Sequence, residues 1–285
     1  MYLQEIDNLD EIITDYDAVI CDIWGVLHNG VSLYQQAIAA LRRSRTKGKK
    51  VILLTNAPKC SDIIQKRFAK MGASDIFWDD TVTSGDTVNA YLHHFAQGKK
   101  VFHWGTDADK GLYENHDVDF ATTIDDAGIV VCTGLLYGTA EISSQEVVLL
   151  QQAFEKNLPF LCANPDKTVK IGDGYEFCAG ALADIYMQLG GAVEFFGKPY
   201  PAVYQRCFDL FKNIDDTIEP AKILAIGDGL YTDIRGAHTM GLGVLLIKNG
   251  LHQELFHERG NDFTALREIC EEYDVMPDYV MDYLA

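Results

Sequence analysis

Short apolar segments alternate with amphipathic helical segments along most of this chain. Residues 18–21, 50–54 and 223–227 are predicted strands, because each is a short, mostly apolar run next to polar residues. Helical periodicity follows the first two strands, at residues 34–47 and 61–71. Strands that alternate with helices pair in parallel. The pattern therefore predicts an α/β fold with a parallel-sheet core.

The alternation continues between residues 100 and 189, but there it indicates a second unit. A length of 285 residues accommodates two domains. No low-complexity linker separates them, so the boundaries follow from pattern alone. We predict a core domain made of residues 1–84 and 191–285, with residues 85–190 inserted into it as a smaller α/β domain.

Composition excludes several classes of protein. The chain has 24 Lys and Arg against 42 Asp and Glu, a formal net charge of -18, whereas nucleic-acid binding requires clustered positive charge. No apolar run is long enough to span a membrane, and residues 1–17 lack the features of a signal peptide. The seven cysteines are dispersed without a CxxC pair, which is typical of reduced thiols. We predict a cytoplasmic protein that binds neither nucleic acid nor membrane.

Two of the predicted strands lead directly into an aspartate, Asp22 and Asp228. Open parallel sheets place their chemistry at the carboxyl ends of the strands. If the two strands are neighbours, the carboxylates repel each other unless a cation lies between them. Hard oxygen ligands favour Mg²⁺, and Asp233, five residues after Asp228, could complete the ligand set.

Two further residues could bind an anion near these carboxylates. Thr55 ends a third strand with a hydroxyl donor, and Lys198 supplies a cation just before a proline. Simpler structural roles are open as well: Thr55 as a strand-end residue, Lys198 as a surface lysine, and Asp233 as a helix N-terminal acid.

In this order the residues resemble the four motifs of the haloacid dehalogenase (HAD) superfamily. The matching segments are Asp22-Ile23-Trp24-Gly25-Val26-Leu27, Leu54-Thr55-Asn56, Gly197-Lys198-Pro199, and Gly227-Asp228-Gly229 with Asp233. The inserted unit resembles the α/β (C2-type) cap of the NagD-like, class IIA branch. The resemblance covers nearly the whole chain and implies a HAD-like Rossmannoid core with an inserted, substrate-selecting cap domain.

The resemblance also implies a role for each matched residue. Asp22 would be the nucleophile that forms an aspartyl-phosphate, while Thr55 and Lys198 hold the phosphoryl charge. Mg²⁺ would be bound by Asp22, by the backbone carbonyl of Trp24, and by the other two aspartates, Asp228 and Asp233. The residues expected to face the substrate are Trp24, Gly25, Asn56, Asp166 and Gly180. The implied activity is a Mg²⁺-dependent phosphatase acting on a small phosphorylated metabolite, such as a nucleotide or sugar phosphate; a homodimer is compatible with the resemblance.

One residue departs from the family pattern. Phosphatases of the superfamily usually carry an acid/base aspartate two residues after the nucleophile, where this chain has Trp24. Indole cannot transfer a proton near neutral pH, and loss of general acid–base help costs about 10²–10⁴-fold in rate. Two alternatives therefore stay open: a catalytically weak, phosphate-binding HAD protein, or a hydrolase of carbon–halogen or carbon–phosphorus bonds. Trp24 itself could pack against the cap or line the substrate pocket.

Overall fold

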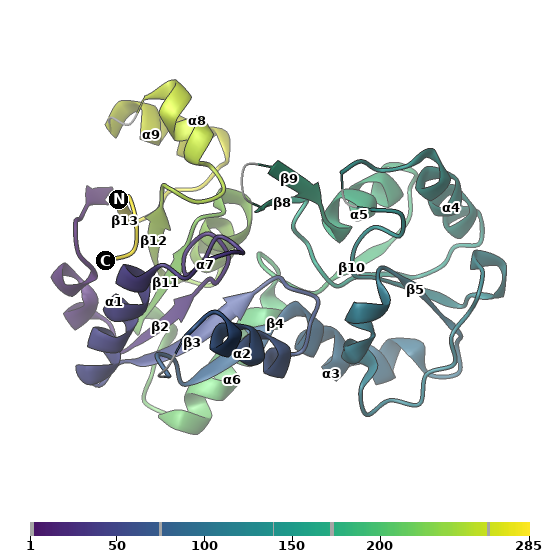
Figure 1. Ribbon diagram of the computed structural model, residues 1–285, viewed down its shortest axis with the longest axis horizontal. Coiled ribbons are helices and arrows are strands. Elements are labelled where there is room, and N and C mark those ends of the chain that lie inside the picture. Colours follow the sequence, from purple (N-terminus) through teal and green to yellow (C-terminus); the bar gives the residue numbers. More distant parts are fainter. Residues whose placement is uncertain (1–2, 74–75, 139, 172–173, 261–262) are drawn as a thin grey trace. The chain divides into compact units, whose positions relative to one another are not determined.

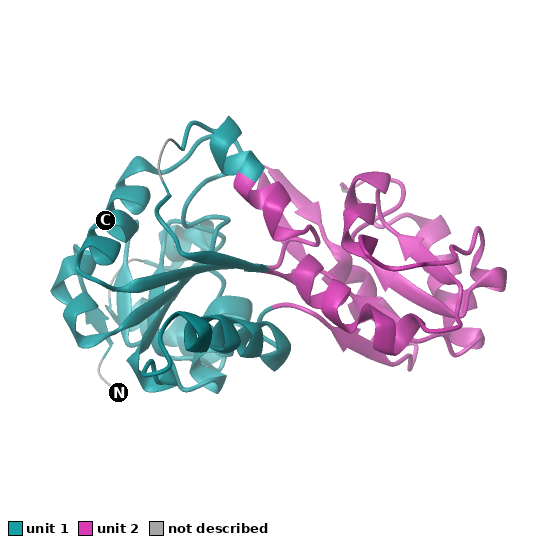
Figure 2. Cartoon of the chain, turned by 90° about the horizontal axis from the view of Figure 1, so that it is seen from below, with its two compact units in different colours: residues 1–55, 66–82, 198–285 teal, residues 56–65, 83–197 magenta. Residues whose placement is uncertain are grey.

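The computed structural model describes residues 3–73, 76–138, 140–171, 174–260 and 263–285. The chain forms two compact units. Unit 1, teal in Figure 2, comprises residues 1–55, 66–82 and 198–285; unit 2, magenta in Figure 2, comprises residues 56–65 and 83–197. Within the described residues, no helix is both long and apolar enough to cross a membrane.

Unit 1 is built on a seven-stranded sheet with the strand order β1-β13-β12-β11-β2-β3-β4. All the pairings recorded from β1 across to β3 are parallel, as the alternating pattern predicts. The bounds of the strands are β1 Gln4–Glu5, β2 Ala18–Cys21, β3 Lys50–Thr55, β4 Asp80–Thr83, β11 Ile223–Gly227, β12 Gly243–Ile247 and β13 Tyr279–Met281.

Helices cover this sheet (Figure 1). Their bounds are α1 Gln35–Thr46, α2 Ser61–Lys70 (of which only residues 66–70 belong to unit 1), α6 Pro201–Ile214, α7 Arg235–Thr239, α8 Gln253–Arg259 and α9 Phe263–Glu272. Alternate strand residues, such as Ile20, Ile52 and Ala225, form one buried cluster with apolar residues of α6, α7, α8 and α9. Successive strand residues point to opposite faces, so the intervening buried residues lie on the other face of the sheet. A sheet buried on both faces has near-continuous apolar strands.

Unit 2 contains a four-stranded parallel sheet with the order β10-β7-β6-β5 and a separate antiparallel pair, β8 and β9. One face of the sheet packs on α4 and α5, and the other on α3 and the 3₁₀ segment Asp107–Tyr113. The bounds are α3 Ser84–Ala96, β5 Val101–Trp104, β6 Ile129–Cys132, α4 Ser144–Glu155, β7 Phe160–Cys162, β8 Thr168–Ile171, β9 Gly174–Phe177, α5 Ala179–Gln188 and β10 Val193–Phe195.

The units divide at other residues than the sequence pattern suggests. Residues 191–197, assigned above to the core domain, belong to unit 2, because β10 pairs in parallel with β7. Residues 56–65 also belong to unit 2, where Lys59 Nζ lies 2.6 Å from Asp109 Oδ1. Both corrections depend on pairing partners that are distant in sequence, so local periodicity could not reveal them.

Candidate active site

Parallel pairing of β2 with β11 brings two aspartates to one edge of the unit 1 sheet. Cys21 pairs with Ile226, and the Asp22 N–H continues the ladder by donating to the Ile226 carbonyl at 2.8 Å. Asp22 therefore lies level with Gly227, and Asp228 is the next residue along the neighbouring strand. Both side chains are buried. The predicted adjacency of the two carboxylates is observed.

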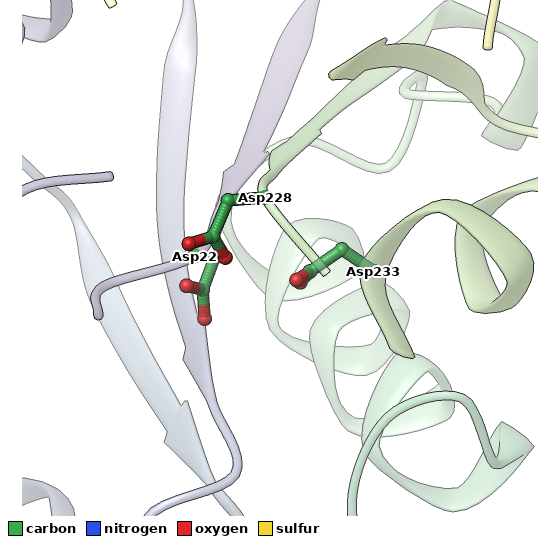
Figure 3. A group of neighbouring side chains, drawn as sticks. All are labelled: Asp22, Asp228 and Asp233. Atoms are coloured by element: carbon green, nitrogen blue, oxygen red, sulfur yellow. The ribbon is translucent and has the colours of Figure 1, made fainter. Parts of the chain in front are cut away.

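The third aspartate reaches the same place from a short π-helical turn, Leu230–Ile234, which precedes α7. The sequence predicts an ordinary helix start at this point. In the structure the Asp233 N–H donates to the Gly229 carbonyl at 2.9 Å, and Asp233 Oδ2 accepts from the Gly229 N–H at 3.0 Å. Figure 3 shows the three carboxylates pointing toward one another, and each offers an oxygen within 4.8 Å of the others.

Lys198 is the cation of this cluster, and it is buried, not on the surface. Its Nζ donates to Asp22 Oδ1, to Asp233 Oδ1 at 2.6 Å, and to the Leu54 carbonyl at 3.2 Å. Lys198 thereby lies beside the nucleophile candidate and the end of β3, where Thr55 is also buried.

The electrostatics of the cluster are unbalanced, because among the described residues three buried carboxylates face one ammonium group, that of Lys198. Burial is the largest cause that raises the pKa of Asp22, to about 7; Lys198 opposes this shift and Asp233 adds to it. Burial, followed by the charges of Asp22 and Asp233, also raises the pKa of Asp228 well above its usual range. For Lys198, burial alone would lower the pKa, but the two carboxylates hold it well above the usual value.

This donor set fits a divalent cation. Carboxylate oxygens are hard ligands of the kind that Mg²⁺ prefers, and a bound cation would offset the excess negative charge. Asp228 is already oriented, since its Oδ2 accepts the Leu251 N–H at 2.7 Å. The carboxylates of Asp22, Asp228 and Asp233 are therefore suited to hold a metal ion.

Two glycines let the backbone approach Asp228 closely. A Cβ on Gly25 would lie 1.9 Å from Asp228 Oδ2, and a Cβ on Gly250 would lie 2.0 Å from the same oxygen. Gly25 also has a φ of 84°, which favours glycine. Its N–H donates to the His28 carbonyl at 2.9 Å, so this amide is engaged within the loop. Gly25 therefore lies beside the acidic cluster, and its predicted contact with the substrate stays a prediction.

Gly25→Ala is expected to destabilise the protein by more than Gly48→Ala. Gly48 has a nearly equal φ of 85° but nothing within 4 Å of its added Cβ, so it isolates the backbone strain, about 1 kcal/mol. Gly25→Ala adds a collision with Asp228 to the same strain. Urea denaturation of both variants measures the difference; equal losses would contradict the close approach.

Three of the predicted substrate contacts, Asn56, Asp166 and Gly180, lie in unit 2, where they contact one another. Asn56 Nδ2 donates to Asp166 Oδ1 at 2.8 Å, and Asn56 is buried. Gly180, in the first turn of α5, donates its N–H to the Asp166 carbonyl at 3.1 Å, and a Cβ there would lie 2.2 Å from the Pro165 carbonyl oxygen. Glycine at 180 is thus required by backbone packing, a reason that its sequence context does not reveal.

The half-buried Trp24 side chain contacts residues of unit 1. Its ring lies edge-on to that of His28, with centroids 4.9 Å apart, and the Arg67 guanidinium lies 5.1 Å from the ring centroid. A Cβ on Gly30 would lie 2.9 Å from the indole. The sequence suggested that Trp24 packs against the cap or lines the substrate pocket, and it did not indicate the contacts with His28 and Gly30. The fold of the loop brings these two residues to the ring.

Comparison with known proteins agrees with this site. A family model described as haloacid dehalogenase-like hydrolase matches residues 19–119, and a second, HAD-hydrolase-like model matches residues 195–285. A crystal structure of a haloacid dehalogenase-like hydrolase from Brucella suis 1330 is 36% identical, with a TM-score of 0.86 over 98% of this chain and 100% of that one. The chain belongs to the haloacid dehalogenase-like hydrolase family.

Two curated relatives of this HAD hydrolase are phosphatases. It is 27% identical over 243 residues to the ribonucleotide monophosphatase NagD of Escherichia coli K12, covering 82% of this chain and 88% of NagD. It is 24% identical over 274 residues to phosphoglycolate phosphatase 1A of Arabidopsis thaliana, covering 88% and 74% of the two chains. The NagD likeness and the inserted α/β unit agree with the NagD-like, class IIA branch.

Sequence reasoning missed the segment that follows β12. Gly250 and Leu251 both contact the Asp228 carboxylate, although neither belongs to a motif recognised above. A signal was present, since β12 is a buried parallel strand and its carboxyl end shares an edge with β11. Any residue directly after such a strand is a candidate for the site.

Proposed function

We propose that this HAD hydrolase is a Mg²⁺-dependent phosphatase of small phosphorylated metabolites, with nucleotide and sugar phosphates as the first candidates. The observation that carries the proposal is the buried group of Asp22, Asp228, Asp233 and Lys198 at the carboxyl edge of the unit 1 sheet. The names of the two curated phosphatases support the substrate class. The free cysteines are compatible with the cytoplasmic location predicted from the sequence.

In the proposed reaction Asp22 attacks the phosphorus atom and the bond to the leaving oxygen breaks, which yields an aspartyl-phosphate. Water then attacks this phosphorus, releasing inorganic phosphate and restoring the Asp22 carboxylate. Asp22, Asp228, Asp233 and the Trp24 carbonyl would hold Mg²⁺, which supplies electrostatic stabilisation of phosphoryl oxygens when bound. Lys198 and the Thr55 hydroxyl would stabilise the charge on the same oxygens.

The direct test is phosphate release from a panel of nucleotide and sugar phosphates, in Mg²⁺ and in EDTA. We expect release that needs the metal, and the preferred substrate would identify the class that unit 2 selects. Substrates that bind without turnover would favour the alternative, a phosphate-binding protein of low activity. Cleavage of carbon–halogen or carbon–phosphorus bonds without phosphate-ester hydrolysis would favour the second alternative, a hydrolase of those bonds.

Trp24→Asp tests whether a missing acid limits the rate. With a carboxyl group two residues after Asp22, hydrolysis of substrates with poor leaving groups is expected to rise by about 10²-fold or more, because their oxygen must be protonated as it leaves. Aryl phosphates, whose leaving groups are stabler anions, should gain little and serve as the internal control. An equal gain for both classes, or none, would contradict an acid–base explanation.

A further inference from the structure

The segment after β12 is joined to the Asp228 loop by two hydrogen bonds of opposite direction. The Leu251 N–H donates to Asp228 Oδ2 at 2.7 Å. In return, the Leu230 N–H donates to His252 Nε2 at 3.3 Å. One bond fixes a carboxylate, and the other fixes the beginning of the turn that leads to Asp233. The loop at residues 228–233 and the segment at residues 250–252 are therefore joined by two hydrogen bonds.

The His252 ring is itself held in place. It contacts Tyr273 edge-on, with ring centroids 5.4 Å apart, and the Tyr273 carbonyl accepts from Arg235 Nη2 at 2.5 Å. Burial lowers the pKa of His252 to about 4, so the ring is neutral near pH 7. A neutral imidazole that accepts at Nε2 carries its proton on Nδ1. The fixed ring thus presents a lone pair to the Leu230 amide.

Leu230 needs such an acceptor. It is fully buried at the start of the π-helical turn, and the first N–H groups of a helical turn have no partner within the turn. Without His252, the Leu230 N–H would lose its acceptor. The turn would then be free to rotate away from the position that directs Asp233 toward Asp22. Partners behind metal-binding carboxylates commonly set cation affinity in this way.

We propose that His252 is a positioning residue of the acidic cluster, which tunes its affinity for a divalent cation by accepting the Leu230 N–H. The inference rests on the proposed function only in requiring that the cluster binds such a cation. His252 touches no reacting atom in this scheme. It acts through Leu230 and the turn, while Gly250 and Leu251 act directly on Asp228.

The test is Mn²⁺ binding followed by electron paramagnetic resonance, with the full chain in the absence of substrate. His252→Phe keeps a ring beside Tyr273 but removes the acceptor, so its dissociation constant is expected to rise by about 10–100-fold. His252→Gln retains an acceptor at similar reach and should bind close to wild type. His257→Phe, an exposed position on α8, is the matched control and should change nothing.

If His252 only filled space, substitution by Asn and by Gln would have the same effect on Mn²⁺ binding. His252→Asn is one methylene shorter than His252→Gln and cannot reach the amide, so it should bind Mn²⁺ as weakly as the phenylalanine variant. This pair keeps the test valid if His252→Phe fails to fold. Wild-type Mn²⁺ affinity in His252→Asn or His252→Phe would overturn the inference about His252. Equally weak Mn²⁺ binding by His252→Asn and His252→Gln would overturn it as well. Neither result would contradict the proposed phosphatase function. A wild-type protein that binds no Mn²⁺ would overturn the proposed metal-dependent function as well.

Discussion

Asp22→Asn is expected to reduce Mg²⁺-dependent phosphate release by about 10³-fold or more, because removal of a covalent nucleophile abolishes the reaction path that it opens. Asparagine has nearly the same shape and can still accept from Lys198, so the fold should persist. The measurement is phosphate release under saturating Mg²⁺, beside circular dichroism of both proteins. The carboxamide also removes one buried charge from a cluster in which acids outnumber bases.

Thermal stability without metal separates a lost nucleophile from a damaged fold. The pKa of Asp22 is raised to about 7 in the folded protein, so its ionised form is destabilised there. Asp22→Asn should therefore unfold at the same or a higher temperature than wild type in EDTA. Mass spectrometry of wild-type protein quenched during turnover should find the phosphoryl group on Asp22. Retention of a tenth or more of wild-type activity would exclude Asp22 as the nucleophile.

Lys198→Met is expected to be the most destabilising single change at this site, by about 3–5 kcal/mol at neutral pH in EDTA. It would leave three buried carboxylates without a cation, since Lys198 contacts both Asp22 and Asp233. Urea denaturation measures the loss. Phosphate release should fall as well, because Lys198 would no longer stabilise the phosphoryl oxygens.

Lys248→Met is a matched control. Lys248 is as buried as Lys198, with 4% of its side chain exposed, and its Nζ lies 2.8 Å from both Glu5 and Asp282. Those two acids are 52% and 57% exposed, so water can solvate them once the lysine is gone. The loss should therefore be smaller. Equal losses for the two lysines would show that the burial of the acids at the active site carries no special cost.

The effect of Lys198→Met should depend on pH. The folded pKa of Asp22 is about 7, above its ordinary 3.8, so protonation stabilises the folded state below about pH 4 and this stability is lost as pH rises through 7. Removal of Lys198 raises the folded pKa further. The destabilisation should accordingly be largest at neutral pH and shrink toward pH 4, and saturating Mg²⁺ should restore part of it.

Much of the core could be predicted from local sequence. The apolar runs that end at Asp22 and Asp228 identify buried strands, and parallel strands bring their carboxyl ends to one edge, so the meeting of the two acids follows from periodicity. Asp233 could be placed with them because it lies a short turn beyond Asp228. The four spaced motifs also identified the family before any geometry was known.

The unit boundaries could not be predicted in this way. Residues 193–195 look like the start of the core, yet they complete the unit 2 sheet by pairing with β7, whose strand ends some 30 residues earlier in the chain. Likewise, Asn56 directly follows Thr55 but contacts Asp166 in unit 2. The unit to which each segment belongs depends on contact partners that are distant in sequence. The hydrophobic periodicity of a segment carries no information about those partners.

The sequence by itself determined the α/β class, the family and the four motifs that supply the site, because strand periodicity and motif spacing are local properties of the chain. Tertiary structure alone decided how those residues are held. It buried Lys198 between two acids, brought Gly250 and Leu251 against Asp228, and set Trp24 on His28. These contacts depend on where loops cross in space, and the free energy of a buried charge depends on the neighbours that folding brings to it.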